Sequence, residues 1–291
     1  MNVLGIDFGG TKVALRVEGE GGRAEEDRLR IGQGEPADAV LHRTFEASRR
    51  LVDRIGGVAS VGVSTPGIVF DDRVDLAPNV AGWSELDLGA RLRVEFGSVK
   101  VSIENDVKAA ALAECREGAL RGSSVGLYVN LGTGIAIAPV VDGQPLRGAH
   151  GAAGEVGYGI VGAVGLWDAS TPTLEEYAGG SGLERRIAAA GDIAAHDVAE
   201  LVADARSSAT AAAMWRDAVD EIARHLITAA LTVDPSRIAI GGGMTRAGSA
   251  LLDPLSTRLA SALPYAPEIV LSQFDADASL RGAVLLARGR S

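Results

Sequence analysis

The feature that most constrains the fold is a strand, a glycine turn and a second strand, which occur in this order twice. The first copy spans residues 3–17, with a tight turn at Gly9-Gly10, and the second spans residues 125–141, with a turn at residues 131–134. Apolar segments joined by short glycine-containing turns are typical of β-hairpins. The repetition predicts that two parts of the chain begin in the same way.

Alternating helical and apolar segments follow each predicted hairpin. The spacing of apolar residues predicts helices at residues 37–55, 106–117, 210–233 and 280–287, and further strands at residues 58–63, 99–103 and 237–240. The polar residues 18–27 are expected to form a hairpin tip. This order predicts an α/β protein with two similar domains and a cleft between them. We place the domains at residues 1–117, completed by a C-terminal helix at 279–291, and at residues 118–278.

Composition narrows the class of protein. The 291 residues are 47% hydrophobic, which is enough for a sizeable core, and the net charge of -10 offers no basic surface to nucleic acid or an anionic membrane. No run of about 18 apolar residues predicts a membrane span, and no secretory signal is evident at the N-terminus. The single cysteine, Cys115, excludes an internal disulfide and a multi-cysteine metal site. We expect a cytoplasmic protein without nucleic-acid or membrane partners.

The first hairpin carries a candidate phosphate site, formed by the consecutive residues Asp7, Phe8, Gly9, Gly10, Thr11 and Lys12. Glycines let backbone N–H groups approach phosphate oxygens closely, and Thr11 and Lys12 can donate hydrogen bonds to phosphate. Asp7 at the strand end is placed to hold Mg²⁺, directly or through water. An ordinary hairpin with good turn chemistry is the alternative interpretation.

Two further glycine segments belong to the second half. Gly132, Thr133 and Gly134 follow Asn130 between two apolar strands, and Gly241, Gly242 and Gly243 follow a strand and precede a predicted helix. Taken alone, the first segment could equally be an ordinary hairpin rather than a phosphate-binding turn. The alternative for the second segment is a flexible loop. Two glycine–threonine turns at equivalent points of two half-chains favour a pair that clamps a polyphosphate, and backbone without side chains at Gly241–Gly243 suits an adenine or ribose.

Carboxylates form the remaining motifs. Asp106 follows Glu104 and Asn105 where a strand leads into a helix, so it is either a capping acid or a base beside an attacking hydroxyl. Asn105 offers a donor and an acceptor to sugar hydroxyls. Glu155 and Glu175 can accept hydrogen bonds from vicinal hydroxyls, whereas Glu176 is expected to be merely solvated.

In order and spacing, these motifs resemble the ROK family over residues 3 to about 288. The resemblance rests on residues 7–12, 104–106, 131–134, 153–157 and 241–243. It implies an α/β, two-domain actin/hexokinase-like (ribonuclease H-like) fold with a central cleft. It also implies a kinase with ATP and Mg²⁺ as cofactors, in which the glycine loops bind ATP and sugar and nucleotide are the small-molecule partners. A homodimer is the expected assembly.

The resemblance also assigns the sugar site. It makes Asp106 the catalytic base and places Asn105, Glu155 and Glu175 around the sugar, together with Asn79 from a matching segment. Tyr158 departs from the family pattern, because typical members have a histidine there, followed by a cysteine cluster that binds zinc. Residues 161–173 contain no cysteine, and the four histidines are far apart in sequence, so we expect no zinc. We expect apolar residues, namely Val161, Val164, Leu166 and Trp167, to hold this loop instead.

The sequence leaves the substrate and two rival functions open. We expect transfer of the γ-phosphoryl group of ATP to a hexose or amino hexose at the 6-hydroxyl, with glucose, kanosamine and glucosamine as candidates. A neutral Tyr158 beside two carboxylates favours a cationic sugar, and an ordinary glucokinase is the alternative. Polyphosphate is the alternative donor. A regulatory, non-catalytic sugar sensor is the alternative of another class, against which Asp106 and the phosphate turns argue.

Overall fold

The fold comes from a computed structural model that describes all residues except 71–73, 76–81, 84, 163–170 and 290–291. The chain divides into two compact units. Unit 1 comprises Met1–Ala113, Pro145–Ala153 and Asp277–Ser291, and unit 2 comprises Glu114–Gln144 and Gly154–Ala276. The segment Pro145–Ala153, which leaves unit 2 for unit 1 and then returns, is a feature that the sequence did not reveal.

Unit 1 is a five-stranded sheet in the order β3-β2-β1-β4-β7. Its elements are β1 (Val3–Phe8), β2 (Lys12–Glu18), β3 (Ala24–Arg30), β4 (Ser60–Thr65) and β7 (Lys100–Asn105), the short pair β5 (Ile68–Val69) and β6 (Val74–Asp75), the 3₁₀ turn η1 (Glu20–Gly22), and the helices α1 (Ala37–Ile55), α2 (Leu88–Phe96) and α9 (Ala278–Arg288). The helix α3 (Asp106–Glu117) and the 3₁₀ turn η4 (Asp275–Asp277) each contain residues of both units. The first two strands form the predicted hairpin, and β4 and β7 continue the sheet in parallel.

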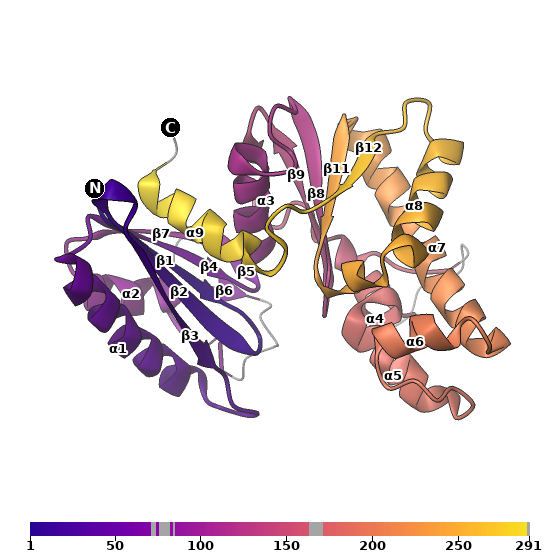
Figure 1. The fold of residues 1–291 in the computed structure, drawn as a ribbon, viewed down its shortest axis with the longest axis horizontal. Coiled ribbons are helices and arrows are strands. Elements are labelled where there is room, and N and C mark those ends of the chain that lie inside the picture. The colour runs from indigo at the N-terminus through magenta and orange to yellow at the C-terminus, as the bar shows by residue number, and fades with distance from the viewer. Residues whose placement is uncertain (71–73, 76–81, 84, 163–170, 290–291) are drawn as a thin grey trace. The chain divides into compact units, whose positions relative to one another are not determined.

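Alternation along the strands decides which helix covers which face of this sheet. Leu4 and Ile6 of β1 belong to the apolar cluster formed with α1, whereas Val3 packs with α9. Figure 1 shows α1 and α9 on opposite faces of the sheet. On the α9 face, Gly62 allows a close approach, because a Cβ there would stand 1.9 Å from the Ala283 carbonyl oxygen. Successive side chains of a strand point to opposite faces, so a continuous apolar strand is buried on both.

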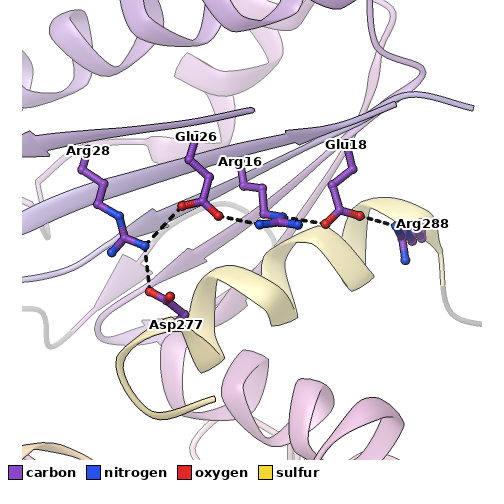
Figure 2. Close-up of polar contacts among 6 residues, drawn as sticks. All are labelled: Arg16, Glu18, Glu26, Arg28, Asp277 and Arg288. Atoms are coloured by element: carbon purple, nitrogen blue, oxygen red, sulfur yellow. Dashed lines mark hydrogen bonds and ion pairs between the residues drawn. The ribbon is translucent and has the colours of Figure 1, made fainter. Parts of the chain in front are cut away.

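One prediction for unit 1 was wrong in part. The hairpin tip that was expected at residues 18–27 covers only residues 19–23, and residues 24–30 form the edge strand β3, antiparallel to β2. The strand lacks apolar alternation because charged side chains occupy this sheet edge, as is usual for edge strands. Figure 2 shows a row of alternating charges across β2, β3 and the two ends of α9, in the order Asp277, Arg28, Glu26, Arg16, Glu18 and Arg288.

Unit 2 has a sheet in the order β10-β9-β8-β11-β12, with the same hairpin and parallel pattern as unit 1. Its elements are β8 (Val125–Leu131), β9 (Ile135–Val141), β10 (Gln144–Pro145), β11 (Arg237–Gly241) and β12 (Glu268–Leu271), the 3₁₀ turns η2 (Val156–Tyr158) and η3 (Gly243–Ala247), and the helices α4 (Leu174–Ala178), α5 (Gly180–Ala190), α6 (Val198–Asp204), α7 (Ala209–Val233) and α8 (Ser249–Ala262). Its core joins β8, β9 and β11 to α4–α8. Within the described part of the chain, no helix is both long and apolar enough to cross a membrane.

Candidate functional site

Asp7 is a buried carboxylate at the end of β1. It lies beside Ser64 of the parallel strand β4, whose hydroxyl donates a hydrogen bond to Asp7 Oδ1 at 2.5 Å. Burial raises the pKa of Asp7 to about 6, against the smaller lowering effects of the Ser64 hydrogen bond and the charge of Lys12. A buried carboxylate of this kind fits a cation-binding role, because a nearby cation would stabilise its charged form.

The turn after Asp7 presents backbone. The Gly9 N–H donates to the Lys12 carbonyl oxygen at 2.9 Å, whereas Gly10 and Thr11 are exposed. The carbonyl of Thr11 accepts the Ile31 N–H at 2.9 Å, which fixes one side of the turn. The exposed residues at the tip fit the predicted binding of phosphate oxygens.

Asn105 and Asp106 share the start of α3. Asn105 is buried, and its Oδ1 accepts hydrogen bonds from the N–H groups of Val107 at 3.0 Å and Lys108 at 3.1 Å. Its Nδ2 donates to the Gly67 carbonyl at 2.9 Å. Asn105 therefore satisfies the first free N–H groups of the helix, a function we had considered for Asp106. Asp106 is the half-buried first residue of α3, and its Oδ1 also accepts from the Val107 N–H, at 2.8 Å.

Unit 2 contains a pocket of about 280 Å³. The β8–β9 turn, the N-terminal parts of α5 and α6, and η3 line it, through Gly132, Thr133, Gly180, Ser181, Glu184, Asp197, Val198, Ala199, Gly243, Met244, Arg246 and Ala247. Backbone and small side chains dominate one side, and Glu184, Asp197 and Arg246 supply charge. Its volume and its mixed lining suit a nucleoside-sized ligand.

The residues of the two predicted glycine segments in unit 2 divide into two groups. Gly132, Thr133 and Gly243 line the pocket, whereas Gly134, Gly241 and Gly242 do not. Gly242 has a φ of 92°, and a Cβ there would lie 2.4 Å from the Leu131 carbonyl oxygen. Gly242 therefore permits a close backbone approach that a side chain would block, whereas Gly134 and Gly241 face the side chains of Glu175 and Tyr128.

Helix α5 holds the turn that lines this pocket. The N–H of Gly180 donates to the Gly132 carbonyl at 2.9 Å, and the N–H of Ser181 donates to the Thr133 carbonyl at 3.2 Å. Sequence reasoning missed this contribution of α5. The signal was present in the small residues 179–182, which read Gly-Gly-Ser-Gly between two helical segments.

Glu175 supports the same turn from α4. Its Oε2 accepts the N–H of Ile135 at 3.0 Å, and a Cβ at Gly134 would lie 2.1 Å from that oxygen. Glu175 and Glu155 are both close enough to Tyr158 for their charges to raise the pKa of its phenol, although burial is the larger cause. The structure thus brings the predicted sugar residues Glu155, Tyr158 and Glu175 together in unit 2. Of the others, Asn105 and Asp106 belong to unit 1, and Asn79 lies outside the described residues.

The loop after Tyr158 is held by polar side chains of α7. Arg224 Nη1 donates to the Gly162 carbonyl at 3.0 Å, and the His225 ring lies so close to Gly159 that a Cβ there would stand 2.6 Å from it. Val161 is buried as expected, whereas Val164, Leu166 and Trp167 lie outside the described residues. Within the described ranges, no three His, Cys, Asp or Glu side chains gather to hold a metal ion.

Glu176 differs from its expected state. It forms a capping box with Thr173, in which each residue satisfies a backbone N–H of the other. Hydrogen bonds from the Thr173 backbone and hydroxyl lower the pKa of Glu176. The expectation of a merely solvated carboxylate was wrong, because Thr173 and Glu176 have the spacing that this motif requires.

Two sheets with the same strand order and glycine turns after their first strands give the chain the actin-like α/β fold. It belongs to the ROK family, whose model matches residues 3–290. The chain is 32% identical over 301 residues to the kanosamine kinase of Amycolatopsis mediterranei, covering 98% of this chain and 95% of that one. Among solved structures, the ROK hexokinase of Thermus thermophilus is 30% identical with a TM-score of 0.82, covering 99% of this chain and 98% of that one. A ROK family glucokinase from Streptomyces griseus, in complex with glucose and AMPPNP, is 28% identical with a TM-score of 0.79 and full coverage of both chains, 100% each.

Proposed function

We propose that the protein is an ATP-dependent sugar kinase that phosphorylates a hexose or amino hexose at its 6-hydroxyl. The observation that carries this proposal is the pocket of about 280 Å³ beside the Gly132–Thr133 turn. The relatives named as kanosamine kinase, hexokinase and glucokinase support the same reaction class.

The pocket favours ATP over polyphosphate as the donor. Val198, Ala199, Met244 and Ala247 contribute apolar surface to it. A nucleoside has a flat base that gains from burial against such surface, whereas a polyphosphate chain has only charged oxygens and gains nothing there.

Asp106 is the proposed base. The 6-hydroxyl oxygen of the sugar forms a bond to the γ-phosphorus while the bond from that phosphorus to the β–γ bridging oxygen breaks. The hydroxyl proton passes to the Asp106 carboxylate, and ADP leaves. Capping by Asn105 orients this end of α3, so Asn105 contributes to the position of Asp106 as well as to sugar binding.

Asp7 is the residue that would hold Mg²⁺, with Ser64 orienting its carboxylate. When bound, Mg²⁺ would neutralise charge on the phosphates, and it commonly keeps several waters beside one or two carboxylates. Gly9, Gly10, Thr11 and Lys12 are proposed to contact phosphate.

Tyr158 supports an amino sugar as the preferred acceptor. Its phenol is neutral, 56% exposed and close to the carboxylates of Glu155 and Glu175. The negative charges of Glu155 and Glu175 would attract a sugar ammonium group. We therefore propose that kanosamine or glucosamine is phosphorylated at least as efficiently as glucose.

Assembly and zinc are further parts of the proposal. We propose that the protein works as a homodimer in the cytoplasm, with sugar and nucleotide as its partners and no nucleic acid. We also propose that it needs no zinc, which is supported by its single cysteine and by the polar contacts of α7 with the loop after Tyr158.

The test is ADP release with glucose, mannose, N-acetylmannosamine, glucosamine and kanosamine, each with ATP or polyphosphate as the donor. We expect ATP-dependent release and a kcat/KM for one amino sugar that equals or exceeds that for glucose. A glucose value more than about tenfold above every amino sugar would end the amino-sugar proposal, which requires at least equal efficiency with one amino sugar. No release with any sugar would end the kinase proposal.

A further inference from the structure

Residues 145–153 are the only described segment by which the chain leaves unit 2 for unit 1 and returns within ten residues. Two contacts fix this segment in unit 1. Arg147 Nε lies 3.2 Å from Glu104 Oε2, and the backbone of Gly151 has a φ of +74° where a Cβ would be 2.9 Å from the Val69 carbonyl oxygen. The Ala153 N–H donates to the Arg147 carbonyl at 3.1 Å and closes the segment on itself.

Glu104 connects Arg147 to the start of α3. Its side chain is only 6% exposed, and its other oxygen, Oε1, accepts the Asn105 N–H at 3.1 Å. The Asn105 side chain in turn accepts N–H groups of the first turn of α3, of which Asp106 is the first residue. An ion pair from Arg147 to Glu104, followed by hydrogen bonds, therefore leads to the backbone that carries Asp106.

We propose that Arg147 is a positioning residue for the phosphoryl transfer, acting through Glu104 on the orientation of Asp106. The proposal rests on the proposed kinase function. The same segment leads directly into Glu155, which follows Ala153 after one residue. Arg147 therefore contacts the residue two positions before the proposed base, and its segment precedes a proposed sugar carboxylate in the sequence.

The physical reason lies in the burial of Glu104. A buried carboxylate is stable only when its charge is paired or hydrogen-bonded, so removal of one cation makes it reorient towards other donors or solvent. Its reorientation would release the Asn105 N–H and loosen the turn before Asp106. Displacement of a reacting group by about 1 Å can cost on the order of 10²-fold in rate.

Arg147→Ala, Arg147→Lys, Glu104→Gln and the double variant Arg147→Ala/Glu104→Gln test the proposal. We expect Arg147→Ala to lower kcat by about 10- to 100-fold. The dissociation constant for ATP should be unchanged, because Arg147 neither lines the pocket in unit 2 nor belongs to the β1–β2 turn. Lysine should restore part of kcat. The double variant should be no slower than the slower single variant, since two partners of one interaction are not additive.

Arg43→Ala is the matched control, because Arg43 also pairs with a glutamate of unit 1, Glu35, at 2.6 Å and is similarly exposed. It should keep wild-type kcat. Wild-type kcat in both Arg147→Ala and Glu104→Gln would overturn the proposal, as would an equal loss in Arg43→Ala. If Arg147→Ala does not fold, Glu104→Gln, which keeps an acceptor for the Asn105 N–H, is decisive. A lowered kcat in Glu104→Gln would then support the proposal, and a wild-type kcat would overturn it.

Amide hydrogen exchange separates this proposal from the kinase function itself. The N–H groups of Val107 and Lys108, which Asn105 caps, should exchange faster in Arg147→Ala than in the wild type. If the wild-type protein phosphorylates no sugar, the proposed function fails, and exchange still shows whether Arg147 holds the turn. Unchanged protection of both amides would refute the positioning of α3 by Arg147.

Discussion

The β1–β2 turn of unit 1 and the β8–β9 turn of unit 2 follow equivalent strands but differ in what lies around them. Two residues before its first glycine, the unit 1 turn has the buried Asp7, and the unit 2 turn has Asn130. In unit 1 the turn residues Gly10 and Thr11 are exposed. The unit 1 turn thus combines a buried charge with open backbone.

In unit 2, hydrogen bonds hold the turn on two sides. Two N–H groups of α5 donate to its carbonyls, and Glu175 accepts the N–H of Ile135 immediately after it. The same backbone pattern therefore has different surroundings in the two units: a buried carboxylate lies beside the turn in unit 1, and a pocket lies beside the turn in unit 2. The comparison teaches that a repeated turn does not imply a repeated function.

Asp106→Asn tests most strongly whether the chemistry belongs to unit 1. We expect kcat to fall by about 10²–10⁴-fold with the fold intact, because an amide cannot accept the proton of the attacking hydroxyl. Steady-state kinetics and thermal melting measure both effects. Asp38→Asn, which changes an acid in the first turn of α1, is the matched control and should remain near wild type. More than about a tenth of wild-type kcat in Asp106→Asn would rule out its role as base.

Exchanging the residues before the two turns sharpens the comparison. Asp7→Asn gives unit 1 the amide of unit 2 and should lower kcat by about 10²–10³-fold, the usual cost of removing one electrostatic group from a transition state. Asn130→Asp, the reciprocal change, should have a smaller effect and should not rescue Asp7→Asn. Kinetics over a range of Mg²⁺ concentrations measure this. Equal losses in the two variants would mean that the turns are functionally equivalent.

Asp7 also predicts a pH dependence of stability. Because burial raises its pKa from 3.8 to about 6, the folded protein holds this proton more tightly than the unfolded chain does. The stability from this proton is fully present below pH 3.8 and is lost as pH rises through about 6. The loss is on the order of 3 kcal/mol.

Asp7→Asn should therefore stabilise the free protein at pH 8 while inactivating it, because an amide is neutral and its oxygen can still accept the Ser64 hydrogen bond. Urea unfolding at pH 4 and pH 8, without Mg²⁺ or nucleotide, measures the difference. A lower unfolding free energy of Asp7→Asn at pH 8 would contradict the prediction.

Gly134→Ala and Gly9→Ala compare how tightly the two turns are packed. A Cβ at Gly134 would lie 2.1 Å from Glu175 Oε2, whereas a Cβ at Gly9 would lie 3.1 Å from the Lys12 carbonyl oxygen. We expect Gly134→Ala to lower the unfolding free energy by about 1–3 kcal/mol, because the Glu175 carboxylate would have to move and leave the Ile135 N–H without its acceptor, and Gly9→Ala to have less effect. Denaturant unfolding of both variants measures this, and a larger loss at Gly9 would invert the comparison.

The sequence predicted features that depend on local pattern and missed those that depend on distant partners. The limits of α1 and β9 follow from apolar spacing and were predicted as observed. Edge strand β3 was missed because its charged residues carry no apolar alternation. The contributions of α5 to the pocket and of Arg147 to Glu104 join residues far apart in the chain, and no local pattern specifies such a contact.

The smallest expected effects concern the loop after Tyr158, for which we predict no bound zinc. Arg224 reaches the Gly162 carbonyl from α7, so Arg224→Ala should lower the unfolding free energy by about 0.5–1.5 kcal/mol, the usual net value of a hydrogen bond. Arg216→Ala, which alters an exposed arginine of the same helix, is the control.

A chelator should leave the melting temperature of the wild type unchanged. Removing a structural metal from a protein lowers its folding free energy, and we expect no such metal here. Elemental analysis that finds about one zinc per chain, or a melting temperature that falls with chelator, would show that a metal rather than α7 holds this loop.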